Sequence, residues 1–396
     1  MTANQHLPLS GIKVIEFTHM VMGPTVGVIL ADLGADVVKI EPTKGDNTRR
    51  LVGSGSGYFP MYNRNKRSIC LDMKSDEGKK VALQLLEDAD VMVENFRPGA
   101  LDKLGLDYQS LHSLNERLIY CSEKGFLKGP YENRTALDEV AQMMGGLAYM
   151  TGPPGQPLRA GASVIDVTGG MFGVIAILAA LEERHRTGKG QHVKSSLFES
   201  TAYLVGQHIA QYAVTGTPAQ PMPARISSWA VYDVFETADN DNIFVGVVSD
   251  TQWEAFCKAF GLPELADDPG YATNPERVKR RDSLIPTVRA LFRQFSKAEL
   301  MEKLEVTGLP YAPITKPQDL IEDPHLNADG GMIDVTLEDG TKARLPALPI
   351  EMAGERLGLR QDLPKIGEHT HEVLSSIGYS SEQIEQMASS GIIRRE

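Results

Sequence analysis

Residues 11–41 read GIKVIEFTHMVMGPTVGVILADLGADVVKIE, and the architecture of the chain follows from this stretch. The apolar run at 11–17 predicts a strand, residues 25–33 predict a helix, and residues 36–41 predict a second strand. This β-α-β unit, with an acid at the end of its second strand, is typical in outline of a dinucleotide-binding fold. The turn at 18–24 lacks the GxGxxG fingerprint, so NAD binding is disfavoured.

The same alternation of strand and helix continues along the first half of the chain. It predicts an α/β fold, with a mostly parallel sheet that carries helices on both faces. In such sheets, ligands bind at the carboxyl ends of the strands. We expect further strands at residues 69–72, 90–94, 118–122 and 192–197, and helices at residues 75–87, 136–150 and 198–215.

Basic and polar side chains follow several of these strands. In a chain with a negative net charge, a local basic set of this kind is a candidate phosphate site. The alternative is that the same side chains are solvated surface charges, and the sequence leaves both open. The set consists of His19, Asn95, Phe96, Arg97 and Lys124 at strand ends, with Lys66, Arg67 and Lys74 nearby in sequence.

The bulk composition is that of a soluble globular protein with about two domains. The chain has 396 residues, 42% hydrophobic and 23% charged, and its net charge of −12 argues against a nucleic-acid partner. Cys70, Cys121 and Cys257 are far apart and form no metal motif, which favours a cytoplasmic protein without bound metal. The first nine residues lack the apolar core of a signal peptide. The longest apolar run, 171–181, is too short to span a membrane.

The composition changes at a proline-rich stretch, where we expect a linker over residues 216–230. Residues 1–215 precede it. Beyond it, a hairpin followed by helices indicates a smaller α+β domain over residues 231–325, and residues 326–396 end the chain. We expect strands here at residues 231–237, 243–248, 331–337 and 342–345, and helices at residues 251–260, 281–295, 296–307, 368–376 and 381–389.

Residues 161–170 read GASVIDVTGG and precede an apolar helix expected at 171–181. Asp166 should therefore lie near the start of a helix, where free N–H groups and the helix dipole favour a carboxylate. The same place leaves donors for a second developing negative charge. The ordinary alternative is that Asp166 only caps the helix, as many aspartates do. The two roles are compatible, and these residues alone leave both open.

Several short motifs follow one another along the chain: GIKV at 11–14, GP at 23–24, LGADVVKIE at 33–41, NKRS at 65–68, ENFRPG at 94–99, RTGKGQ at 186–191 and GEHT at 367–370. With these motifs the chain resembles the family III CoA-transferases, which include formyl-CoA transferase, carnitine CoA-transferase and the α-methylacyl-CoA racemases. The resemblance implies a Rossmann-like large domain made of residues 1–215 and 326–396, with the small domain inserted between them. It also implies that two ring-shaped chains interlock as a homodimer.

The resemblance assigns the role of nucleophile to Asp166, since the family nucleophile is an aspartate before a small-residue turn and a helix. Its carboxylate would attack an acyl-CoA thioester to give an acyl-aspartyl anhydride, which the freed CoA thiolate converts to an aspartyl-CoA thioester. A carboxylic acid then enters and the steps run in reverse. The backbone N–H groups of Gly169 and Gly170 are expected to stabilise the oxyanions, and the apolar surroundings to exclude water.

The resemblance also indicates where the acyl-CoA substrate binds, and it implies no permanently bound cofactor. The expected CoA-binding residues are His19, Met20, Val21, Leu71, Met73, Lys74, Asn95, Phe96, Arg97 and Lys124. The candidates for an acceptor pocket are Arg49, Arg50, Trp229 and Tyr232, together with Arg225, and a distal carboxylate of a dicarboxylic acid such as succinate would meet Arg49, Arg50 or Arg159.

Two departures from the family patterns bear on function. Residues 225–229 lack the glycine run of formyl-CoA transferases, which disfavours formate and oxalate as substrates. Racemisation needs two bases, and racemases of the family supply one from a His-Asp dipeptide, which here reads Leu137-Asp138. We therefore expect CoA transfer to a free acid. The alternatives are an acyl-CoA racemase or epimerase acting at the α-carbon, and a non-catalytic CoA-binding protein.

Overall fold

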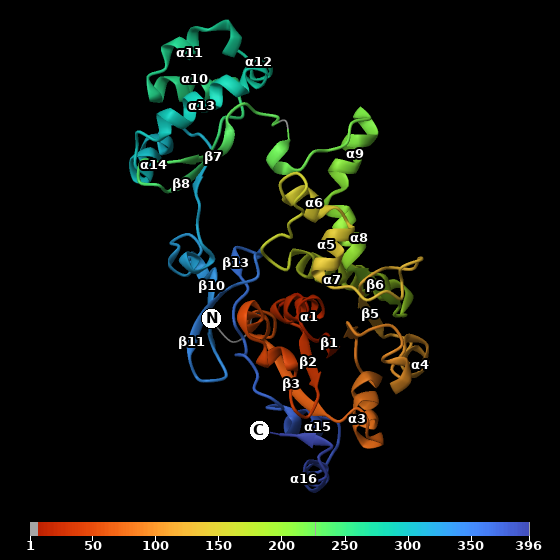
Figure 1. The fold of residues 1–396 in the computed structure, drawn as a ribbon. Coiled ribbons are helices and arrows are strands. Elements are labelled where there is room, and N and C mark those ends of the chain that lie inside the picture. Colours follow the sequence, from red (N-terminus) through yellow and green to blue (C-terminus); the bar gives the residue numbers. More distant parts are fainter. Residues whose placement is uncertain (1–6, 226, 396) are drawn as a thin grey trace. The chain divides into compact units, whose positions relative to one another are not determined.

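The computed structural model describes residues 7–225 and 227–395, which form two compact units (Figure 1). The first unit takes in the chain up to Pro223 and again from Ile321 onward, and the second runs from Ala224 to Leu320. The return of the chain to the first unit makes the second unit an insertion within it.

Two expectations fall partly outside the described residues. Residues 1–6 make up most of the segment in which we expect no signal peptide, and Ile226 belongs to the stretch that lacks a glycine run.

A seven-stranded sheet forms the centre of the first unit, in the order β14-β3-β2-β1-β4-β5-β6. Six strands are parallel, and β14 (Ile393–Arg394) joins the edge strand β3 antiparallel. The predicted α/β class with a mostly parallel sheet is therefore confirmed. The parallel strands are β1 (Lys13–Phe17), β2 (Asp36–Glu41), β3 (Lys66–Leu71), β4 (Val91–Glu94), β5 (Ile119–Lys124) and β6 (His192–Ser196).

The direction of the strand order reverses between β1 and β4. From β1 the chain adds β2 and β3 on one side, then crosses back and adds β4, β5 and β6 on the other. In open parallel sheets, the crevice outside the carboxyl ends at such a reversal is the usual ligand site. This reversal therefore identifies the edge of the sheet where a site is expected.

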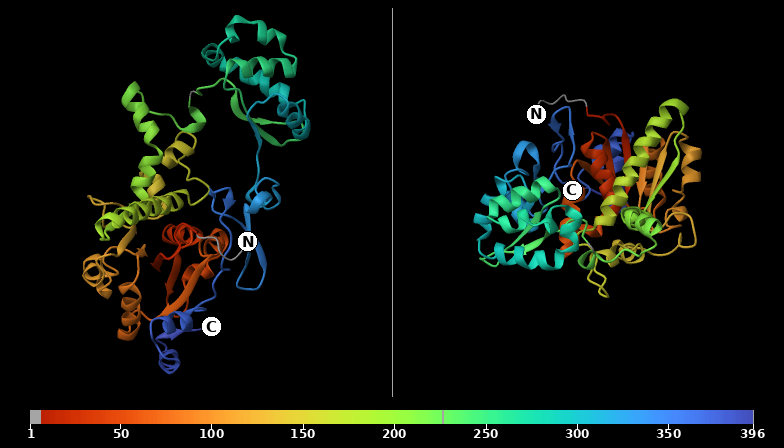
Figure 2. Two further views of the ribbon diagram at one scale, coloured as in Figure 1. Left: turned by 180° about the vertical axis from the view of Figure 1, so that it is seen from behind. Right: turned by 90° about the horizontal axis from the view of Figure 1, so that it is seen from above.

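Alternate residues of the strands face two separate cores, as the period of a strand requires. On one face, Val14 and Val93 pack with α1 (Met22–Asp32) and α7 (Val164–Thr187). On the other face, Ile15 and Met92 pack with α3 (Asp76–Glu87), α4 (Tyr108–Leu114), α15 (Thr370–Ser376) and α16 (Ser381–Ser389). Figures 1 and 2 show the C-terminal helices α15 and α16 beside the strands from the start of the chain.

Helix α7 is much longer than the sequence indicated. Residues 164–170 before the expected helix and residues 182–187 after it are also helical, so the helix spans 24 residues rather than 171–181. By length and composition it would suffice to cross a membrane, contrary to our expectation. Val174, Ile177 and Leu181 are, however, buried in the core beside α1 and the sheet, as in the central helix of a globular protein.

Two other predicted helices are each divided in two. The helix expected at 136–150 is α5 (Asp138–Met144) and α6 (Leu147–Thr151), separated by two glycines of which Gly146 has φ +86°. That left-handed conformation is one that glycine adopts without strain. The helix expected at 198–215 is α8 (Leu197–Leu204) and α9 (Gly206–Thr215).

The second unit has its own core around a three-stranded antiparallel sheet. The predicted hairpin is confirmed as β7 (Tyr232–Glu236) and β8 (Asn242–Gly246), and β9 (Tyr311–Pro313) completes the sheet. Its helices are α10 (Asp250–Phe260), α11 (Pro263–Asp267), α12 (Asn274–Lys279), α13 (Arg281–Phe292) and α14 (Lys297–Glu305), of which the sequence did not predict α11 and α12.

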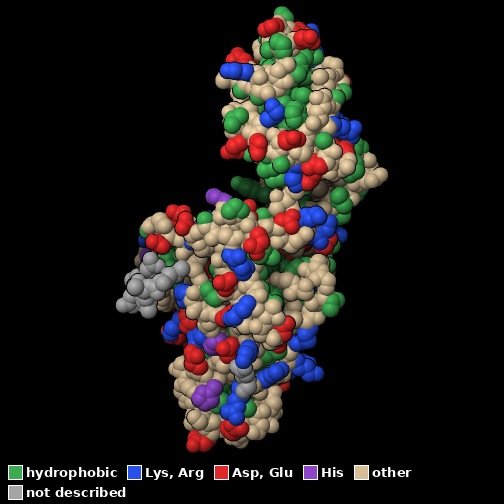
Figure 3. All heavy atoms as spheres, turned by 90° about the vertical axis from the view of Figure 1, so that its left-hand side faces the viewer, with side chains coloured by type: hydrophobic (Ala, Val, Ile, Leu, Met, Phe, Trp, Pro, Cys, Tyr) green, Lys and Arg blue, Asp and Glu red, His purple; other side chains and the backbone are tan. Residues whose placement is uncertain are grey.

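After the second unit, the chain forms two small antiparallel hairpins before it reaches α15. The first pairs β10 (Met332–Thr336) with β11 (Lys342–Pro346), close to the predicted positions. The second pairs β12 (Glu351–Met352) with β13 (Glu355–Arg356). On the face of the molecule drawn in Figure 3, acidic and basic side chains lie interspersed.

Candidate active site

Asp166 is the third residue of α7, and it does not cap that helix. A second carboxylate does so: Oδ2 of Asp138, from the start of α5, accepts the backbone N–H groups of Ile165 (2.9 Å) and Asp166 (3.2 Å). The carboxylate of Asp166 itself has no hydrogen-bond or ion-pair partner within residues 7–225 and 227–395. The capping interpretation of Asp166 is therefore wrong, and its carboxylate is available for another task.

Asp138 is held in place from two sides. Its Oδ1 accepts a hydrogen bond from Gln142 Nε2 at 2.5 Å and lies 3.4 Å from Arg159 Nη2. Gln142 in turn accepts the backbone N–H of Ala160 at 2.8 Å, in the loop that leads to α7. Both acceptor side chains are buried. Together these bonds fasten α5, the loop and the first turn of α7 to one another, which fixes the position of Asp166.

The carboxyl of Asp166 titrates far from its ordinary range. Burial, and then the charges of Asp138 and Glu139, raise its pKa to about 7, while Arg159 opposes the rise. The helix dipole, which we expected to favour ionisation, is thus outweighed by loss of solvent and by two neighbouring acids. A carboxylate of this kind is more basic than an exposed one, a property that suits a nucleophile.

A tyrosine that the sequence did not point to lies within electrostatic range of this carboxyl. Burial and the charge of Asp166 raise the pKa of Tyr62 to about 12, so its phenol stays protonated at neutral pH. Tyr62 ends α2 (Tyr58–Tyr62). Nothing in the local sequence marks it, because this electrostatic interaction joins segments about a hundred residues apart.

Gly169 and Gly170 do not offer free N–H groups. They lie inside α7, beyond the first turn whose N–H groups lack an intrahelical partner. Their role as oxyanion donors is therefore not supported. What they allow is close packing on α1: a Cβ on Gly169 would lie 2.5 Å from Met22 Cε, and one on Gly170 would lie 2.7 Å from Met22 O.

The strand reversal is bridged by two residues that the sequence had singled out. His19, after β1, donates its backbone N–H to Asn95 Oδ1 (3.0 Å), and Asn95 Nδ2 donates to the carbonyl of His19 (2.8 Å). The ring of His19 lies 5.3 Å from that of Phe96, and burial lowers the pKa of this histidine. The ends of β1 and β4 are thus joined at the point where a ligand is expected.

The backbone of Met20, the next residue in this turn, is held by a buried network of hydrogen bonds and an ion pair. Its φ of +64° is strained for a side chain other than glycine. Its N–H donates to Thr48 Oγ1 at 3.0 Å, Thr48 N–H donates to Asp46 Oδ1 at 2.9 Å, and Asp46 pairs with Lys39 at 3.2 Å. Lys39 Nζ also donates to the carbonyl of Thr18 at 2.7 Å. The network fixes both ends of the turn.

The remaining residues of the expected CoA site divide into exposed and buried ones. Arg97 and Lys74 are exposed beyond the ends of β4 and β3. Lys124 is anchored, with Nζ 2.6 Å from Glu94 Oε1 and 2.9 Å from the carbonyl of Phe96.

Other predicted contacts face the interior. The side chains of Val21 and Leu71 are buried, so neither can touch a ligand, and Met73 packs against the core. Lys66 and Arg67 begin β3, at the opposite end of the strand from the expected site, and pair with Glu16 and Asp36. The proposed phosphate set therefore loses these two members.

Arg49 cannot serve an acceptor pocket. Its guanidinium makes two hydrogen bonds to Glu41 (2.8 and 2.6 Å), donates to the carbonyl of Pro364, and lies 3.7 Å over the ring of Phe59. Arg50 is exposed and is hydrogen-bonded within its own loop.

The remaining acceptor-pocket candidates, Arg225, Trp229 and Tyr232, belong to the second unit. There the rings of Trp229 and Tyr232 lie 5.0 Å apart. Whether they reach an acceptor pocket stays a prediction.

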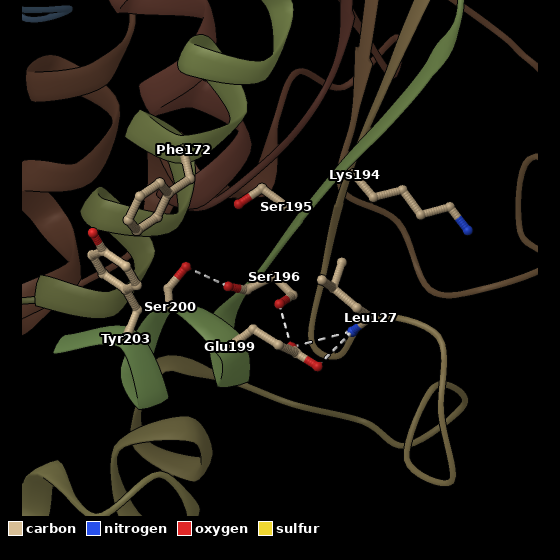
Figure 4. A pocket seen from close by; sticks show the side chains of 8 residues that line it. All are labelled: Leu127, Phe172, Lys194, Ser195, Ser196, Glu199, Ser200 and Tyr203. Atoms are coloured by element: carbon tan, nitrogen blue, oxygen red, sulfur yellow. Dashed lines mark hydrogen bonds between the residues drawn. The ribbon is translucent and has the colours of Figure 1, made fainter. Parts of the chain in front are cut away.

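A cavity beside α7 and α8 is separate from these residues. In Figure 4, Phe172 and Tyr203 close one side, Glu199 binds the Leu127 backbone and Ser196, and Lys194 points away from the cavity. None of the residues predicted for the site lines this cavity.

Comparison with known proteins identifies one family. Residues 9–370 match CoA-transferase family III. Succinate–glutarate CoA-transferase of Agrobacterium fabrum is 37% identical, over 94% of this chain and 96% of that protein. Formyl-CoA:oxalate CoA-transferase of Streptomyces avermitilis is 34% identical, over 97% of this chain and 99% of that protein. A solved structure of a CAIB/BAIF family protein from Brucella suis has a TM-score of 0.84 at 35% identity, over 94% of this chain and 100% of that one.

Proposed function

The chain belongs to CoA-transferase family III, and on that premise we propose that it moves CoA from an acyl-CoA to a free dicarboxylic acid with Asp166 as the nucleophile. The observation that carries the proposal is the carboxylate of Asp166, which is half-buried, has no hydrogen-bond or ion-pair partner among the described residues, and lies at the start of α7 while Asp138 caps the helix in its place. A carboxylate that loses much of its solvent without gaining a partner is costly to keep ionised, so the presence of this one points to a chemical role.

The reaction is a series of acyl transfers between carboxylate oxygens and the CoA sulfur, and it needs no oxidant or reductant. An Oδ of Asp166 attacks the thioester carbonyl, the C–S bond breaks, and an acyl-aspartyl anhydride and CoA thiolate result. The thiolate then attacks the aspartyl carbonyl, which releases the donor acid and leaves an aspartyl-CoA thioester. The carboxylate of the acceptor acid attacks the aspartyl carbonyl of this thioester, which breaks the C–S bond and gives a second anhydride and CoA thiolate. The thiolate then attacks the acceptor's acyl carbon, and the C–O bond breaks to give the new acyl-CoA and free Asp166.

CoA binds along the carboxyl edge of the sheet. The turn of His19 and Met20 and the segment Asn95–Arg97 follow neighbouring strands on either side of the reversal. Lys124 is the last residue of the next strand, β5, and the exposed Lys74 adds positive charge after β3. The support of the turn by Thr48 gives the substrate a preformed surface, because the strained backbone is fixed before CoA arrives.

Relatives with names that specify succinate, glutarate or oxalate suggest a dicarboxylic acid as the second substrate. Human succinyl-CoA:glutarate CoA-transferase is 31% identical over 98% of this chain and 91% of that protein. Since residues 225–229 lack a glycine run, we place succinate and glutarate ahead of oxalate.

The racemase alternative finds little support in the geometry. Leu137 stands where a racemase has its histidine, and its side chain is 59% exposed. Asp138, the remaining acid of the dipeptide, is committed to the N–H groups of α7 and to Gln142. Neither residue is a free base opposite Asp166. Deuterium uptake at the α-carbon of a chiral 2-methylacyl-CoA in the absence of an acid would reverse this choice.

The active form is a homodimer of interlocked chains in the cytoplasm. Met171, Ile175 and Leu178 form an exposed apolar stripe on α7 at helical spacing. On the adjoining helices α8 and α9, Tyr203, Leu204, Ile209, Tyr212 and Val214 are also exposed. A stripe of this extent suits a protein interface. Light scattering should give the mass of two chains, and a monomer at assay concentration would refute the dimer.

Asp166→Asn tests the catalytic role. With succinyl-CoA and glutarate, chromatography of the CoA products should show loss of transfer by at least about a thousandfold. The matched control is Asp76→Asn, since Asp76 also lies in the first turn of a helix but is fully exposed. Full activity of Asp166→Asn would refute the mechanism.

A further inference from the structure

Arg159 lies in the loop before α7, and four groups hold its guanidinium. Nε donates to the carbonyl of Ala160 (3.0 Å), Nη2 donates to the carbonyl of Ala162 (3.0 Å) and lies 3.4 Å from Asp138 Oδ1, and Nη1 pairs with Glu139. The first three partners are backbone atoms or a buried side chain. Glu139 differs from them, because its side chain is 50% exposed.

The pair with Glu139 is therefore the one contact of this guanidinium that another carboxylate can replace. Exposed ion pairs contribute little to stability, so their exchange meets little resistance. The planar fork of arginine matches any carboxylate equally well, whether it comes from a side chain or from a bound acid. The other three contacts would keep the guanidinium in position during such an exchange.

The position of Arg159 relates this exchange to the reaction. Asp138 touches both Arg159 and the backbone N–H of Asp166, so a single carboxyl group separates the cation from the nucleophilic residue. The charges of Arg159 and Glu139 are also both felt at the carboxyl of Asp166. A short dicarboxylic acid that presents one carboxyl to Asp166 would bring its other carboxyl into this neighbourhood.

Of the three arginines that the sequence offered for a distal carboxylate, Arg159 is the one that remains. Arg49 is buried in its pair with Glu41, and Arg50 is exposed and tied to its own loop. Within the described residues, neither makes a hydrogen bond or an ion pair with the first turn of α7.

We propose that Arg159 binds the distal carboxylate of the dicarboxylic acid, and that Glu139 holds the same guanidinium until the acid displaces it. The inference rests on the proposed CoA transfer and adds the residue pair that selects the acid. Glu139 thus competes with the substrate. It weakens the binding of dicarboxylic acids, while leaving monocarboxylic acids unaffected by this contact.

Glu139→Gln removes the competing charge and keeps the side chain's size. The test compares glutarate with pentanoate, an acid of equal length and one carboxyl, against one acyl-CoA donor. We expect the KM for glutarate to fall about three- to fivefold, while the KM for pentanoate stays within about twofold. Arg159→Lys, which keeps the charge but not the fork, should raise the KM for glutarate selectively. Glu116→Gln, an exposed change elsewhere, is the control.

The readout is the ratio of kcat/KM for the two acids. Because Glu139 also influences the pKa of Asp166, an effect through the nucleophile would change kcat/KM for both acids by the same factor. An unchanged ratio in Glu139→Gln therefore overturns the inference, even if the rates shift. Transfer to both acids with an unchanged ratio leaves the proposed function standing, whereas transfer to neither acid by the wild-type protein refutes the proposed function itself.

Discussion

Replacing Asp166 with asparagine is expected to stabilise the protein while it abolishes transfer. The pKa of this carboxyl is about 7, against 3.8 for a free aspartate, mainly because of burial and then because of Asp138. The folded state therefore binds more protons than the unfolded state between these two values, and its stability falls as pH rises through them. The difference of about 3 units between the two pKa values corresponds to about 4 kcal/mol of the free energy of unfolding, and all of it is lost above pH 7.

Asparagine cannot ionise, so the variant does not lose this stability. The free energy of unfolding of the variant, minus that of the wild type, should grow by about 2 kcal/mol between pH 5.5 and pH 8 and stay level above that. Urea unfolding at the two pH values measures the change, at one protein concentration because the active form is proposed to be a dimer.

The growth of the difference with pH matters more than its absolute value, since the amide adds hydrogen-bonding needs of its own. Asp76→Asn, at an exposed first-turn position, should show no such pH-dependent gain. A difference between Asp166→Asn and wild type that is constant from pH 5.5 to pH 8 would refute the reasoning about a raised pKa.

Three further changes test other parts of the structure. Thr48→Val removes the acceptor that supports the turn after β1, and should raise the KM for acyl-CoA several-fold with little change in the KM for the acid. Gly170→Ala places a methyl group 2.7 Å from a backbone carbonyl of α1 and should lower the free energy of unfolding by about 1–3 kcal/mol. Gly206→Ala, which meets nothing within 4 Å, should not lower it. Asp138→Asn should move the acidic limb of kcat/KM to lower pH, because a neighbouring negative charge that raises the pKa of Asp166 is gone.

Local sequence patterns were sufficient for most of the sheet. The apolar runs of β1 and β2 predicted these strands within two residues, because both are buried on two faces. The start of α7 was missed for a physical reason. A short apolar run such as Val164-Ile165 suits a strand as well as a helix. In the structure this run is helical, and the helix is capped by Asp138, which lies 27 residues before Ile165 in the chain.

The candidate site shows the same limit. Asp166 was singled out through the family resemblance, whereas the bond from Asp138 that orients it depends on tertiary packing. Arg49 was misassigned because its partner, Glu41, and the ring of Phe59 become its neighbours only in the fold. Leu71 ends a strand at the expected edge, but the alternation of side chains turns it into the core.

The central claim is that Asp166 carries CoA covalently, and mass spectrometry of the peptide that contains it is the most direct test. The protein is incubated with an acyl-CoA and no acceptor acid, quenched, digested and compared with Asp166→Asn. We predict a CoA thioester on the wild-type peptide at Asp166, which hydroxylamine converts to a hydroxamate, and no adduct on the variant. An unmodified Asp166 under conditions where transfer proceeds, or an adduct on another residue, would contradict the account.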